Sequence, residues 1–151
     1  MLFFSILLAC GLVVNCVSIH YETLRLLTRM SRKQKRWYSN RFRACLLVLG
    51  CMAAHAMEVV LFGLGFQLIE FVNQGSDLHG STPDTFNCNY YSLVVYTSIG
   101  FGYVVPVSRA MRMLTAFEGL TGAILIAWTA SFMFFHMQQF WRFEEENSPS
   151  S

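Results

Sequence analysis

The chain has 151 residues, of which 54% are hydrophobic and only 13% are charged. Ordinary soluble domains contain about 45–50% apolar and about 25% charged residues, so this composition excludes a typical soluble domain. A net charge of +2 is too small to indicate a nucleic-acid partner, and the charged residues are bunched between long uncharged stretches. The sequence therefore predicts an all-α integral membrane protein in contact with the lipid bilayer.

The first predicted element, residues 1–21, is long enough to cross a membrane. Residues 2–21 contain no Asp, Glu, Lys or Arg, and at about 1.5 Å a residue they span roughly the 30 Å of the hydrocarbon core. A cleaved signal peptide is the competing interpretation, but no basic residue precedes this run and no small-residue cleavage pattern follows it. We expect a retained transmembrane helix.

Residues 22–43 form the most basic stretch of the chain. They carry eight of its eleven Lys and Arg residues, with Glu22 as the only acidic residue. Short loops of this composition stay in the cytoplasm, which puts the N-terminus outside the plasma or bacterial inner membrane and the C-terminus inside. Arginines recur at helical spacing, so part of this loop is expected to lie against anionic lipids of the inner leaflet.

Two more apolar runs are long enough to cross the membrane. Residues 44–69 are predicted as a second helix and residues 110–141 as the last one. Between them, residues 70–87 are rich in Asn, Gly, Asp and Pro, which predicts an external loop. Residues 142–151 contain three consecutive glutamates and are expected to form a short acidic cytoplasmic tail.

The uncharged stretch 85–108 does not have the composition of a continuous helix. Residues 88–97 can form a helix that is too short to cross, and two glycines and several β-branched residues then interrupt it. Irregular backbone is tolerated at membrane depth only where it is buried in protein or faces a polar cavity. We therefore predict a segment that enters the membrane and returns on the same side. The competing topology, a full span, would move the C-terminal tail outside.

Backbone carbonyls can replace the hydration water of a cation when successive ones turn toward one axis. Such a backbone needs residues that adopt positive φ, and Gly100 and Gly102 supply them two positions apart. A short helix ending at Thr97 would aim its negative end toward the ion. One chain cannot surround an axis, so several copies are expected to assemble with cyclic symmetry.

These residues resemble the pore module of potassium channels, with its outer helix, re-entrant pore helix, selectivity filter and inner helix. The resemblance covers residues 44–141. Tyr90-Tyr91-Ser92 is similar to the opening of the pore helix in that family, and Thr97-Ser98-Ile99-Gly100-Phe101-Gly102 is similar to its filter signature. Phe117-Glu118 and Gly122 resemble the start of the inner helix, where a glycine acts as a hinge.

The resemblance implies a homotetramer of chains with three transmembrane helices each, which passes potassium down its gradient and is not an enzyme. It places the pore helix at 88–97 and the filter at 98–102. The ion-coordinating residues would be Ser98, Ile99, Gly100, Phe101 and Gly102, with Tyr91, Thr97 and Tyr103 as supporting residues. Potassium at the filter carbonyls would be the only metal, with no other cofactor. Regulation by a nucleotide or calcium module would need a separate subunit.

The sequence departs from the family pattern at the filter. Ser98 stands where threonine is usual, which keeps the hydroxyl but removes the methyl group that stiffens χ1. Tyr103 replaces an aspartate and Val94 replaces its frequent glutamate partner, so no orphan buried charge remains. Such changes can relax selectivity, and a non-selective monovalent cation channel is the alternative within the channel class.

Several polar side chains lie in the apolar runs. Glu58 and His55 share one face of the second helix, and Glu118 lies near the start of the last one, within reach of Arg109 or Arg112. Because a carboxylate in a membrane is costly, we expect either a structural hydrogen bond to the pore helix or a neighbouring subunit, or a pH-responsive contact.

A row of residues recurs every four positions on the last helix: Gly122, Ile126, Ala130 and Phe134. This spacing is typical of a cavity lining with Phe134 as a hydrophobic constriction, and equally of helix packing.

A function of another class, a haem-binding electron carrier, would need His55 and His136 to face each other.

Overall fold

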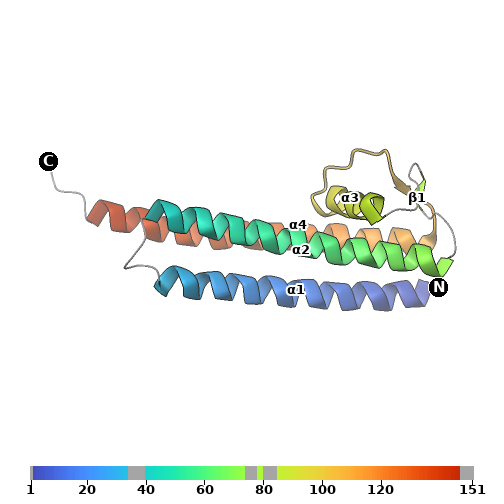
Figure 1. Cartoon of the computed structure of the whole chain (residues 1–151), viewed down its shortest axis with the longest axis horizontal. Helices are drawn as coiled ribbons and strands as arrows, with labels where there is room; N and C mark the ends of the chain where they lie inside the picture. The colour runs from blue at the N-terminus through green and yellow to red at the C-terminus, as the bar shows by residue number, and fades with distance from the viewer. Residues whose placement is uncertain (1, 34–39, 74–77, 80–84, 147–151) are drawn as a thin grey trace.

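The computed structural model describes residues 2–33, 40–73, 78–79 and 85–146. Four helices follow in chain order: α1 (Leu2–Lys33), α2 (Asn40–Asn73), α3 (Thr85–Tyr96) and α4 (Arg109–Glu146). Two short strands, β1 (Leu78–His79) and β2 (Val105–Pro106), form an antiparallel pair. In Figure 1 the three long helices run alongside one another, and α3 lies at the end that holds the N-terminus.

Three of these helices are long and apolar enough to cross a membrane, as the sequence predicts. The candidate spans are Leu2–Ser31, Arg41–Asn73 and Arg109–Gln139. At about 1.5 Å a residue, each exceeds the roughly 30 Å of a hydrocarbon core, so their ends extend into the headgroup regions or beyond. The chain is therefore a multi-pass membrane protein.

The first helix is longer than predicted. It continues from residue 21 through half of the basic stretch to Lys33, so residues 22–33 are helix and not a loop along the leaflet. Arg, Leu, Met and Lys continue a helix readily, and neither Gly nor Pro occurs in this part to end it. The remainder of the predicted loop, residues 34–39, lies outside the described residues.

The segment after α2 differs from a single span. Helix α3 has 12 residues, about 18 Å, and ends at Tyr96, while residues 97–104 are not helical. It begins at Thr85, inside the stretch 70–87 predicted as loop, because no helix breaker follows Pro83. The pairing of Leu78 with Pro106 and of His79 with Val105 was not predicted. It attaches the stretch predicted as an external loop to the chain that follows the predicted filter.

Helices α2 and α4 form the centre of the bundle. Both contact α1, and both contact α3, which lies on the other side of them from α1 in Figure 1. Phe62, Phe66 and Leu114 are buried at the end near α3, and the ring of Phe66 meets that of Tyr91 edge to face at 5.1 Å. This packing fixes α3 against the two central helices.

Candidate functional site

The end of α3 is closed by a capping motif that starts the predicted filter. The amide of Ser98 donates to the carbonyl of Val95 at 3.0 Å, and the amide of Ile99 donates to that of Val94 at 3.2 Å. This pair of bonds defines a Schellman motif, in which the residue after the helix takes a left-handed conformation. Ser98 has φ 57°, although glycine is usual at this position.

The sign of φ alternates from one residue to the next along the predicted filter. Ser98, Gly100 and Gly102 have φ of 57°, 62° and 74°, with Ile99 and Phe101 between them. This alternation is the backbone pattern that lets successive carbonyls face one side and replace the water around a cation. The sequence predicts positive φ at the two glycines, and the structure confirms it. It does not predict Ser98, because serine rarely adopts this conformation.

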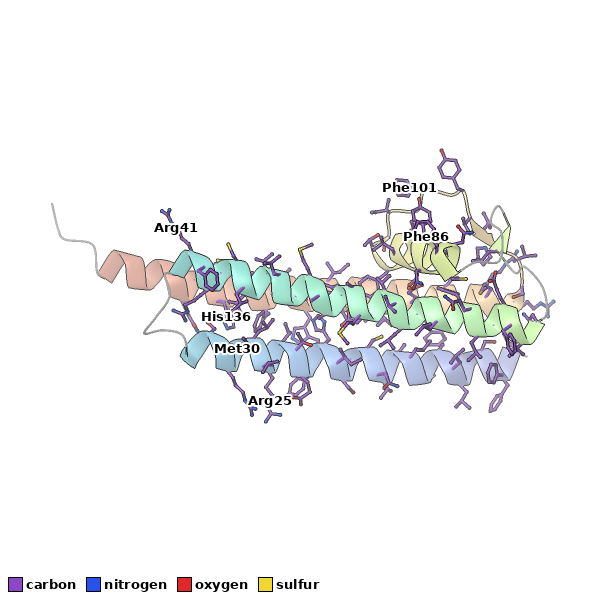
Figure 2. The ribbon with its side chains drawn as sticks, viewed as in Figure 1. Arg25, Met30, Arg41, Phe86, Phe101 and His136 are labelled. Carbon is purple, nitrogen blue, oxygen red and sulfur yellow. The ribbon has the colours of Figure 1, made fainter. Side chains whose placement is uncertain are left out.

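The predicted filter is open on one side in the isolated chain. The side chains of Ile99 and Phe101 are each 57% exposed, and no atom lies within 4 Å of a Cβ built on Gly100 or Gly102. Figure 2 shows Phe101 on the side of the bundle away from α1. The narrow space between this segment and α3 is lined by Tyr90, Tyr91, Val94, Phe101, Gly102, Tyr103 and Val104.

The three supporting residues have different surroundings. Tyr91 is buried, and its hydroxyl bonds the Thr115 hydroxyl at 2.9 Å, which ties α3 to α4. The Thr97 hydroxyl donates to the Leu93 carbonyl of its own helix at 2.7 Å. Tyr103 is 80% exposed and so makes little contact with its own chain.

Glu118 connects α4 to α3 through Ser92. It does not pair with Arg109 or Arg112, the two arginines that lie within its reach in the sequence. The Ser92 hydroxyl is hydrogen-bonded to Glu118 Oε1 and donates to the Val59 carbonyl at 2.7 Å. Arg112 instead donates to the Pro106 carbonyl at 3.2 Å. A serine hydroxyl has one proton, and the Val59 carbonyl can only accept, so satisfying both contacts requires a proton on Glu118. Glu118 is fully buried, which favours this neutral form.

We predict that Ser92→Ala destabilises the chain more than Glu118→Gln. The alanine leaves Glu118 Oε1 without a partner in the interior, a loss of about 1–3 kcal/mol. The glutamine amide can donate to Ser92 as a protonated carboxyl does, so its effect is expected to stay below about 1 kcal/mol. Thermal unfolding of both variants in the same detergent measures the difference. A glutamine variant as unstable as the alanine variant would show that Glu118 carries its charge.

Glu58 lies at a junction of all four helices. Its Oε1 is 2.9 Å from His20 Nδ1 of α1, and its Oε2 is 3.2 Å from His55 Nδ1 and accepts from the Tyr96 hydroxyl of α3. The Nε2 atoms of His55 and His20 lie 3.0 and 3.2 Å from the Thr129 hydroxyl of α4. The expected hydrogen bond from Glu58 to the pore helix is confirmed.

The Glu58 junction links the first helix to the start of the predicted filter. Tyr96, the residue that bonds Glu58, is the last residue of α3 and stands two positions before Ser98. The sequence did not predict His20 and Tyr96 as partners of Glu58, or Thr129 as a partner of the two histidines. The only signal for His20 was a polar residue in an otherwise apolar run.

The row on α4 divides into two environments. Ile126, Ala130 and Phe134 are exposed on the isolated chain, whereas Gly122 is buried. A Cβ on Gly122 would lie 3.0 Å from the carbonyl carbon of Tyr96 and closer to its oxygen. Gly122 therefore permits close contact between α4 and the end of α3. This contact agrees with the packing interpretation of this glycine.

The two histidines of the haem alternative make separate contacts. His136 Nδ1 bonds the Phe132 carbonyl of its own helix at 3.0 Å, and its ring packs on Phe132. His55 contacts Glu58, Tyr96 and Thr129. Each imidazole thus has its own polar partners within the described residues.

Comparison with known protein families assigns most of the chain to one of them. The ion channel family matches residues 54–139, more than half of the chain, a region that contains most of α2, all of α3, the predicted filter and most of α4. No curated protein and no solved structure matches the chain. The chain belongs to the ion channel family.

Proposed function

We propose that the chain is the subunit of a potassium-selective channel in which four copies surround one pore. The observation that carries this proposal is the alternation of positive φ at Ser98, Gly100 and Gly102 directly after a short helix. Rings of carbonyls from such segments provide the sites that replace the hydration shell of a permeating cation. Ser98 adds its hydroxyl at the end of the filter next to α3.

The exposed side of the proposed filter supports assembly of several copies of the chain around one axis. Irregular backbone cannot face lipid, because its carbonyls and amides would have no partner there. Four copies with closed symmetry bring these segments together around an axis. In that arrangement the exposed Ile126, Ala130 and Phe134 of α4 line the path below the filter, with Phe134 as the hydrophobic constriction.

The channel works in a cell membrane with the N-terminus outside and the basic stretch 22–43 inside. The positive-inside rule supports this orientation, and the arginines of this stretch meet anionic lipid headgroups. Conduction needs no catalytic residue and no cofactor besides the permeant potassium ion.

Selectivity is tested by the reversal potential of the purified chain in planar bilayers. A selective pore is expected to shift its reversal potential by about 59 mV for each tenfold potassium gradient. It should keep this shift when sodium is present on the side with less potassium. A potential that stays near zero in opposed potassium and sodium solutions would assign the chain to non-selective monovalent cation channels. Ser98 and Tyr103, the two departures at the filter, would then be the residues to revert first.

A further inference from the structure

The Glu58 junction has the donor arrangement of a metal site. One nitrogen or oxygen each from His20, His55 and Glu58 lies within 4.8 Å of the other two. His20 and Glu58 have no exposed side-chain surface, while the His55 side chain is 21% exposed in the isolated chain. Both Nδ1 atoms point at the same carboxylate.

The protons available at the junction do not satisfy its contacts. Six polar contacts join His20, His55, Glu58, Tyr96 and Thr129. With neutral imidazoles and an ionised Glu58, the two rings and the two hydroxyls supply only one proton each. At least two contacts therefore lack a proton of their own, and a cation placed between the Nδ1 atoms and the carboxylate would remove this deficit.

Thr129 provides the outer support that histidine ligands require. A metal-bound imidazole donates its second N–H to an acceptor, which fixes the ring and its tautomer. The Nε2 atoms of His20 and His55 lie 3.2 and 3.0 Å from Thr129 Oγ1, and a hydroxyl oxygen has two lone pairs to accept both. This tautomer leaves both Nδ1 lone pairs directed at Glu58. The Tyr96 hydroxyl bonds Oε2, the carboxylate oxygen that His55 Nδ1 faces, and lies 2.8 Å from this nitrogen.

We propose that His20, His55 and Glu58 bind a zinc ion. Two imidazoles and one carboxylate are a common zinc donor set, whereas magnesium and calcium prefer oxygen ligands alone. Zinc bonds of about 2.0–2.1 Å place tetrahedral ligands about 3.4 Å apart, so side-chain movements of about 1 Å close the site. The ion joins α1 to α2 beside the residue that ends α3. This inference does not depend on ion selectivity.

The experiment uses the full chain, stripped with a chelator and titrated in detergent with zinc and, separately, with cobalt as a spectroscopic probe. We expect one zinc per chain and an intense visible cobalt spectrum. His20→Gln and His55→Gln are expected to weaken zinc binding by more than about 100-fold, and Thr129→Val by about 10–100-fold. His136→Gln is the matched control, because this histidine bonds its own helix, and it should bind like the wild type.

A cysteine variant protects the test against loss of the fold. His20→Cys replaces one zinc ligand with another, so it should bind zinc and add a thiolate-to-cobalt charge-transfer band. Elution volume and helical content show which variants are folded. Equal zinc affinity of the wild type and folded His20→Gln, or no binding by a folded wild type, would overturn the proposal and leave the junction as a protonated hydrogen-bond network. Ion flux enters neither readout, so a non-selective or silent channel leaves this result intact.

Discussion

Replacing Gly100 with alanine is expected to abolish potassium flux while the chain still folds and inserts. Gly100 has φ 62°, and no atom lies within 4 Å of a Cβ placed there, so space is not the obstacle. An L-residue at this φ costs roughly 1–2 kcal/mol, which sums to about 4–8 kcal/mol over the four copies of the proposed tetramer. The backbone relaxes by returning to negative φ, which turns the neighbouring carbonyl away from the pore axis.

The measurement is flux from liposomes loaded with potassium. A penalty of about 4 kcal/mol corresponds to at least a roughly 10³-fold fall in the population of the conducting filter. Gly11→Ala is the matched control. A Cβ there also meets no atom within 4 Å, but its φ is helical and the residue lies on α1. We expect this control to conduct like the wild type. A conducting Gly100→Ala channel would refute carbonyl coordination by this segment.

The spans were predictable because they depend on composition alone. Long apolar runs with few charges mark α1, α2 and α4, and no contact between distant residues is needed to recognise them. Their ends were harder to predict. The continuation of α1 to Lys33 shows that charge marks the membrane boundary but does not end a helix, since arginine is a good helix former.

In the predicted filter, positive φ was predictable at Gly100 and Gly102 but not at Ser98. The conformational freedom of glycine is visible in the sequence, whereas positive φ at Ser98 is imposed by the capping bonds to Val94 and Val95. The local sequence thus indicates where the backbone can adopt a left-handed conformation. At Ser98 this conformation depends on the packed end of α3.

The buried polar contacts were the least predictable part of the site. Glu58 and His55 lie three residues apart and could be paired on one helix face from the sequence. His20 and Tyr96 both lie 38 residues from Glu58, and Ser92 lies 26 residues from Glu118. Periodicity within one helix carries no information on such pairs, since they depend on how the helices are rotated against one another. The wrong assignment of Arg109 or Arg112 to Glu118 has this cause.

Gly122→Ala is expected to destabilise the chain and to displace the end of α3. The added Cβ would lie 3.0 Å from the carbonyl carbon of Tyr96 and closer to its oxygen. The obstacle is backbone, so α4 and α3 must separate, and overpacking of this kind costs about 1–3 kcal/mol or more. The separation also strains the bond from Tyr96 to Glu58 and the cap at Ser98. Thermal unfolding in detergent and potassium flux should both fall.

Gly119→Ala, one turn earlier on the same helix, provides the opposite expectation. Its Cβ would meet its nearest neighbour, Val95 Cγ1, at 3.9 Å, an ordinary contact. Alanine is better than glycine in a helix by about 1 kcal/mol, so this variant should be as stable as the wild type or more stable. Comparing the two alanine variants therefore distinguishes a packing role of Gly122 from a role as a hinge. A hinge at Gly122 would let the alanine variant keep its stability and lose only opening, whereas close packing against Tyr96 requires both stability and flux to decrease together.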